Sequence, residues 1–259
     1  MKPDPVLNGQ VIDTPTAQEF TRMALEKVSE HDLGDVAARL ERKSAMFFDA
    51  FAEERVMDIG EEAVIAVLKS VFSARRKANI ILTSLTLDGF RRAVRGLLYA
   101  DMSPGDRLQE FAELIDGIGR DVPEGTGHDL GSEILHFTYP ESYWLWTRWM
   151  WNPVTGTGAL PLVVMEEVDL DGETVSETYR RINLALTFLD GVGEQAGFRP
   201  EGHGVFGTDV FLAAVYSVYM YTTLRMRMTQ EFNRIVPELG DLVKRLLGVN
   251  KFPAVAEVT

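Results

Sequence analysis

The spacing of apolar residues along this chain predicts a fold made almost entirely of helices. Through most of the sequence, apolar side chains recur at the three- and four-residue steps that line one face of an α-helix. The stretch from Leu239 to Leu247, for example, has apolar residues at steps i, i+3, i+4, i+7 and i+8. About ten helices are expected, over residues 14–29, 33–55, 61–72, 75–85, 87–99, 103–115, 133–137, 174–193, 209–235 and 237–247.

Local capping signals support three of the predicted helix starts. Residues 14–19, Thr-Pro-Thr-Ala-Gln-Glu, offer an N-cap, a first-turn proline and a capping box. Ser103 is an N-cap candidate that stands directly before a first-turn proline, Pro104. Residues 174–177, Thr-Val-Ser-Glu, form a second capping box. These signals fix where three helices begin more firmly than apolar spacing alone does.

The middle of the chain is less regular. Residues 122–131 and 152–158 are rich in glycine and proline, and they are expected to form loops. Residues 160–168 are apolar and β-branched and run into the turn sequence Asp-Leu-Asp-Gly, so they predict a strand. Because a lone strand needs a partner, we expect one short β-hairpin near residues 160–172 in an otherwise all-α protein.

The length of the chain favours a single helical domain over residues 1–259. A chain of 259 residues lies at the upper end of what one hydrophobic core supports. No linker long enough to separate independent domains is visible. Within the domain, we expect an N-terminal helical subregion, 14–100, and a C-terminal one, 174–248, around an aromatic segment at 130–158.

Composition narrows the classes of function. The sequence has no cysteine, which excludes disulfides, thiolate metal ligands and a cysteine nucleophile. The first five residues lack the apolar core of a secretory signal. The apolar run Val210–Leu224 is shorter than the roughly 20 residues that span a bilayer. We therefore expect a cytoplasmic protein that does not enter a membrane. Its net charge of −13 disfavours nucleic acid as a partner.

The aromatic run at residues 143–151 is the most unusual feature of the chain, because it contains all four tryptophans. Such a concentration marks either a structural keystone or a binding surface. In the second interpretation, Arg148 is the charged anchor among the aromatic side chains. The residues expected to bind a protein partner or a small ligand are Tyr143, Trp144, Trp146, Arg148, Trp149 and Trp151.

Glu133 and His136 form a Glu-x-x-His pair, which places a carboxylate and an imidazole on the same helix face. Di-iron helical bundles use two such pairs, whereas this chain has one. The alternative interpretation is a histidine at the edge of the core. In that interpretation no cofactor is expected. In the metal interpretation the cofactor is a divalent metal, with His128 or His203, in glycine-rich loops, as further ligands.

A cluster of basic residues lies between positions 75 and 95, where Asp88 is the single acid. It forms either a local basic face that binds nucleic acid or two solvated helix faces that offset the carboxylates of residues 49–62. The basic residues concerned are Arg75, Arg76, Lys77, Arg91, Arg92 and Arg95.

Residues 114–119, Leu-Ile-Asp-Gly-Ile-Gly, followed by residues 131–143, Gly-Ser-Glu-Ile-Leu-His-Phe-Thr-Tyr-Pro-Glu-Ser-Tyr, resemble the helix–hairpin–helix region of DNA glycosylase-like proteins. The resemblance implies that backbone amides of the hairpin, at Gly117 and Gly119, hold a DNA phosphate. The catalytic aspartate of that family falls at or next to Thr147. A threonine cannot perform its role, so the resemblance implies a shared helical scaffold without the chemistry.

These observations lead to three hypotheses of function. No nucleophile elbow, Walker loop or dinucleotide fingerprint is present in the sequence. The first hypothesis is therefore a non-catalytic accessory protein that binds a protein partner or small ligand through the aromatic segment. A homo-oligomer is compatible with this hypothesis. The second is a nucleic-acid-binding helical domain that uses the basic cluster and the hairpin. The third is a metal-dependent enzyme centred on Glu133 and His136.

Overall fold

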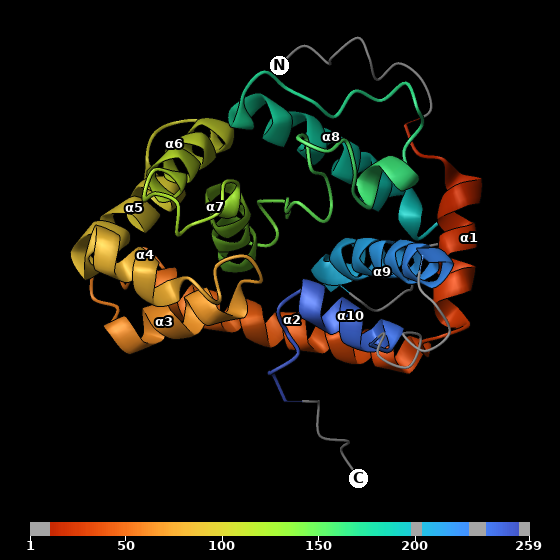
Figure 1. Cartoon of the computed structure of the whole chain (residues 1–259), viewed down its shortest axis with the longest axis horizontal. Coiled ribbons are helices and arrows are strands. Elements are labelled where there is room, and N and C mark those ends of the chain that lie inside the picture. Colours follow the sequence, from red (N-terminus) through yellow and green to blue (C-terminus); the bar gives the residue numbers. More distant parts are fainter. Residues whose placement is uncertain (1–10, 198–203, 228–236, 254–259) are drawn as a thin grey trace. The chain divides into compact units, whose positions relative to one another are not determined.

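The computed structural model describes residues 11–197, 204–227 and 237–253, and within them it is all-α (Figure 1). The described residues form ten α-helices, which confirms the expected fold class. The helices are α1 (Thr14–Leu25), α2 (Glu30–Phe51), α3 (Glu61–Ser70), α4 (Ala78–Leu85), α5 (Leu87–Tyr99), α6 (Pro104–Asp116), α7 (Thr126–Thr138), α8 (Val175–Gly193), α9 (Gly207–Arg227) and α10 (Leu239–Leu246).

The chain divides into two compact units, each built from segments distant in sequence. Unit 1 comprises Met1–Leu40, Trp149–Leu170 and Leu184–Thr259, and unit 2 comprises Glu41–Arg148 and Asp171–Asn183. Helices α2 and α8 each contribute residues to both units. The single domain expected over residues 1–259 stays a prediction.

Helix α7 is the centre of unit 2. It packs against α6 and α5, and all thirteen of its residues are buried. Gly127 allows the close approach of α6, because a Cβ at this position would lie 2.4 Å from the backbone oxygen of Ala112. Phe47 and Phe51 of α2 are also fully buried, and the Phe47 ring lies 5.5 Å from that of Phe137. This apolar face of α2 therefore lies in the core of unit 2.

Unit 1 is organised around α9, which contacts α1 and α10. Residues Gly204–Thr223 make the one described helical stretch that is long and apolar enough to cross a membrane. However, 67% of its apolar window is buried inside the protein, as is usual for a core helix. The apolar run that begins at Val210 is therefore part of the interior of unit 1. The predicted extension of this helix from residue 228 to 235 lies outside the described residues.

The predicted β-hairpin at residues 160–172 is wrong. Leu160–Leu162 instead form a short 3-10 helix, and Val164 makes an isolated antiparallel bridge with Ile12. Asp13 N–H donates to the Val163 oxygen at 2.9 Å. Pro161 accounts for the difference, because proline has no N–H to donate to a strand ladder and its fixed φ favours a helical turn.

Several helix boundaries also differ from the sequence prediction. The chain turns between α1 and α2 at residues 26–29, so α2 begins at Glu30 and not at Leu33. The loop expected over residues 122–131 is helical from Thr126, so His128 is buried instead of exposed on a loop. The Asp116 carboxylate stabilises this early start by accepting hydrogen bonds from the Gly125 and Gly127 N–H groups at 2.9 and 2.7 Å.

Candidate functional site

The interior of unit 2 contains a charged pair. Lys43 Nζ of α2 lies 2.5 Å from Glu133 Oε2 of α7, and the side chains are 0% and 4% exposed. The same ammonium lies 4.1 Å from the centroid of the Phe137 ring. Because neither charge reaches water, each depends on the other for its electrostatic stabilisation.

Burial raises the pKa of the Glu133 carboxyl above its ordinary value, since the charged form loses its hydration. The Lys43 ammonium acts in the opposite direction, while the negative charge of Asp129 adds to the upward shift. The predicted metal ligand Glu133 thus forms an ion pair with a lysine inside the core.

His136, the other residue of the predicted metal pair, is 0% exposed. Its Nδ1 lies 2.7 Å from the backbone oxygen of Tyr143, and its ring meets Phe137 edge-on at 4.9 Å. Among the described residues, no three histidine, aspartate or glutamate side chains are grouped so as to hold a metal ion. His203 lies outside the described residues. These contacts favour the core interpretation of His136.

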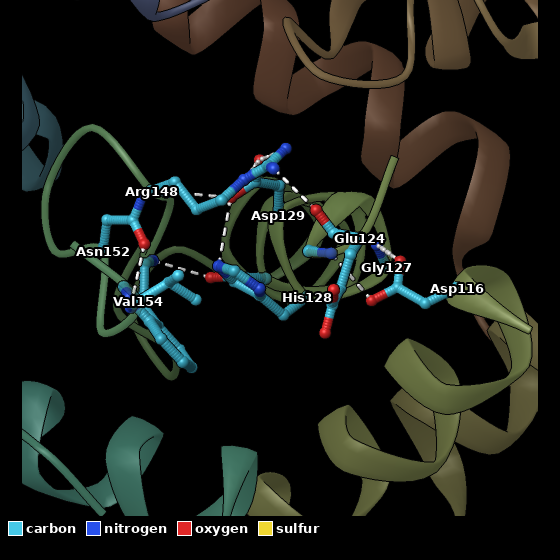
Figure 2. A network of polar contacts seen from close by, with 11 residues as sticks. Asp116, Glu124, Gly127, His128, Asp129, Arg148, Asn152 and Val154 are labelled. Carbon is cyan, nitrogen blue, oxygen red and sulfur yellow. Dashed lines mark hydrogen bonds and ion pairs between the residues drawn. The ribbon is translucent and has the colours of Figure 1, made fainter. Parts of the chain in front are cut away.

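Arg148 connects the aromatic run to the start of α7. Its backbone N–H and Nε donate to the two Asp129 carboxylate oxygens at 2.8 and 2.9 Å, and Nη1 donates to the Glu124 oxygen at 2.7 Å (Figure 2). Burial alone would raise the pKa of Asp129, but His128 and Arg148 outweigh it and lower that pKa. Arg148 therefore acts as an internal anchor, although its side chain remains 31% exposed.

The aromatic run is largely part of the core. Trp146 is 1% exposed, and its ring stacks on His128 at 4.4 Å and on Tyr179 at 6.4 Å, all within unit 2. Trp149 and Trp151, in unit 1, are each 8% exposed. Tyr143 and Trp144 are half-buried. This burial favours the structural interpretation of the run over a binding surface.

The Gly117–Gly119 hairpin has little that would attract a phosphate. The nearby N–H groups at the start of α7 already bind the Asp116 carboxylate, and Asp121 and Glu124 add negative charge to the loop. Gly119 itself has a φ of +125°, which favours glycine for conformational reasons. Thr147, at the position of the family's catalytic aspartate, is 3% exposed and so lies away from solvent.

The basic cluster divides into engaged and exposed residues. Arg91 donates to the Ile59 oxygen and to Asp88, while the Arg75 guanidinium lies 4.3 Å from the Phe72 ring centroid. Lys77 is half-buried. The exposed members are Arg76, Arg92 and Arg95. In the interpretation as a basic face, only these three arginines are exposed.

The surface of unit 2 contains a groove of about 750 Å³ between α2 and α3. The α2 residues that line it lie at steps i, i+3, i+4, i+7 and i+8, so one face of the helix forms one wall. The rest of the lining comes from the connecting segment 54–60 and from one side of α3. The lining residues are Arg42, Ala45, Met46, Asp49, Ala50, Glu54, Arg55, Asp58, Ile59, Gly60, Ala63, Ala66 and Val67.

No known protein family, curated protein or solved structure matches this chain.

Sequence reasoning missed this α2–α3 groove. On α2, the buried stripe that contains Lys43 and Phe47 gave the stronger signal. A second, weaker stripe with Ala45, Met46 and Ala50 runs along a neighbouring face of the same helix. Most of its residues are small, and charged residues lie between them in the stripe. From the sequence alone, the stripe therefore resembles an ordinary solvated helix face.

Proposed function

We propose that this chain is a non-catalytic helical protein that binds a helical segment of a partner protein in the α2–α3 groove. The observation that carries the proposal is that one face of α2, the connecting segment 54–60 and one face of α3 together line a largely apolar groove of about 750 Å³. Grooves of this kind accept the apolar face of an amphipathic helix.

The openness of the groove favours a helix over a small ligand. Ala45, Gly60, Ala63 and Ala66 line it and are all exposed, so its floor is accessible along its length. Small-molecule sites instead enclose most of the ligand surface. The lining from Arg42 to Ala50 extends about 12 Å along α2, which corresponds to roughly two turns of a bound helix.

The proposal keeps the hypothesis of an accessory protein that binds a partner but moves the site away from the aromatic run. Trp146, Trp149 and Trp151 are buried, so their area already contributes to internal packing. The exposed apolar residues of the groove remain available for a partner.

Site-specific photo-crosslinking in cells of the source organism tests the proposal. A crosslinking benzoylphenylalanine replaces Ala66 in the groove and, as a control, Ser84, which is exposed on α4 outside the groove lining. Each protein is also prepared with Ala63→Phe, which fills the groove. Because Ala63 is exposed, this change should leave the core intact.

We expect one protein to crosslink at position 66 but not at position 84, and Ala63→Phe to abolish that product. The crosslinked peptide of the partner should map to a helical segment. The proposal is wrong if positions 66 and 84 give the same products, or if filling the groove leaves the products unchanged.

A further inference from the structure

We infer that the partner helix is basic, with lysine or arginine beside its apolar face. This inference rests on the proposed function, because it concerns the occupant of the same α2–α3 groove. It is carried by the charges that surround the groove.

Carboxylates outnumber basic groups around the groove: its lining has three carboxylates and two arginines, and further carboxylates flank it in sequence. Residues 49–62 contain six carboxylates and one basic residue, Arg55. Asp49, Glu54 and Asp58 line the groove itself, and all three are exposed. Glu61 and Glu62 are exposed in the first turn of α3. A partner that covers the apolar floor must therefore approach several carboxylates at once.

The basic residues near the groove cancel only part of this charge. Arg91 donates to the oxygen of the lining residue Ile59, but it also pairs with Asp88. Lys43 is directed into the core, where it pairs with Glu133. Arg55 Nη1 lies 2.6 Å from Asp49 Oδ1, which leaves Glu54 and Asp58 without an ion pair among the described residues. Arg42 is the remaining cation of the lining, and it is half-buried.

An apolar floor with an acidic rim selects its occupant by charge as well as by shape. Lysine and arginine on a bound helix would reach the rim with their flexible stems while the apolar face covers the floor. An acidic helix would bring like charges together, and a nucleic acid or anionic membrane would be repelled in the same way. The charge complementarity therefore points to a basic amphipathic helix.

Two labelled model peptides test the inference against the full chain. Each has about 16 residues, long enough to form a helix, with leucines at steps i, i+3, i+4 and i+7. One carries lysines at the remaining positions and the other glutamates. Fluorescence anisotropy measures the affinity for the natural chain, for Glu54→Gln/Asp58→Asn, and for Ala63→Phe. The matched control is Asp101→Asn/Glu110→Gln, which removes two exposed carboxylates of unit 2 outside the groove lining.

We expect the lysine peptide to bind and the glutamate peptide not to bind. The double substitution Glu54→Gln/Asp58→Asn should lower the affinity for the lysine peptide by about threefold to tenfold, with a smaller effect at high salt. The Asp101/Glu110 control should leave the affinity unchanged, and Ala63→Phe should abolish binding.

The outcomes separate the two proposals. If both peptides bind equally and only Ala63→Phe weakens them, the groove is a docking site but the inference of a basic partner is wrong. If Ala63→Phe does not affect a bound peptide, the groove is not the site and both proposals fail. If neither peptide binds, the inference is overturned, and the crosslinking experiment alone decides the proposed function.

Discussion

Lys43 Nζ lies 2.5 Å from Glu133 Oε2 in the interior of unit 2, joining α2 to the central helix α7 across 90 positions of sequence. The aromatic rings of Phe47 and Phe137 enclose the ammonium group. Two charges removed from water in this way contribute little net stability, but each becomes costly when its partner is lost.

Removing one member of this pair should therefore destabilise the protein more than removing both. Lys43→Met leaves a buried carboxylate unpaired and should lower the free energy of unfolding by about 3–5 kcal/mol. The double variant Lys43→Met/Glu133→Leu has no buried charge at this point and should recover much of that loss. Urea denaturation followed by circular dichroism measures both variants against the natural chain.

A double variant no more stable than Lys43→Met would contradict this account. Lys69→Met provides the control for the loss of a lysine, because Lys69 is exposed on α3. It should change the free energy of unfolding by less than about 0.5 kcal/mol.

The fold was predictable where a segment's structure depends on its own residues. The caps at Ser103 and Thr174 lie where the sequence placed them, with Asp106 N–H and Glu177 N–H as their donors. Some failures are local, because Pro161 disfavours the expected strand and Asp13, not Thr14, caps α1. Other differences involve distant partners. Val164 pairs with Ile12, and α7 begins early because Asp116 caps it from the preceding helix. Neither partner can be recognised from local periodicity.

Gly127 permits the contact between α6 and α7, so replacing it should weaken unit 2. In Gly127→Ala the new methyl group would lie 2.4 Å from the Ala112 oxygen, and backbone must move. We expect a loss of about 1–3 kcal/mol in the free energy of unfolding, measured by urea denaturation.

Gly96→Ala is the matched control for that substitution. Gly96 lies inside α5 and is exposed. A Cβ added at this position would have no neighbouring atom within 4 Å outside its own helix. Alanine should stabilise the helix here by about 0.5–1 kcal/mol. Equal effects of the two substitutions would show that helical propensity, and not the contact between α6 and α7, determines the result at Gly127.

The aromatic run should behave as core. Trp146→Ala removes a ring stacked between His128 and Tyr179 and should cost about 3–5 kcal/mol of unfolding free energy. Trp144 is half-buried, so Trp144→Ala should cost clearly less. Thermal unfolding of the two variants provides the comparison. A Trp146→Ala protein as stable as the natural chain would restore the interpretation of the run as a binding surface.

The candidate site was less predictable than the fold, because its elements give weak signals separately. All four tryptophans attracted a functional interpretation, yet aromatic side chains serve cores and interfaces equally well. The groove depends on small residues such as Ala63 and Ala66, whose significance appears only when α3 lies beside α2. The acidity of residues 49–62 was visible in the sequence, but its position around an apolar groove was not.

The lowered pKa of Asp129 predicts how stability changes in acid. Burial opposes ionisation of this carboxyl, but His128 and Arg148 hold its pKa below the ordinary value of 3.8. The unfolded chain therefore takes up a proton at a higher pH than the folded chain does. The resulting stabilisation is complete above pH 3.8 and is lost as the pH falls through the folded-state pKa.

Asp129→Asn should consequently be much less stable than the natural chain near neutral pH, and the difference should shrink below pH 3.8. Urea midpoints for both proteins, measured in parallel between about pH 3 and pH 7, test this trend. Asp121→Asn, at an exposed position of the same unit, controls for the loss of one negative charge and should stay close to the natural chain. A stability difference that is constant over the whole range would mean that Asp129 acts by packing and hydrogen bonding alone, and not through its charge.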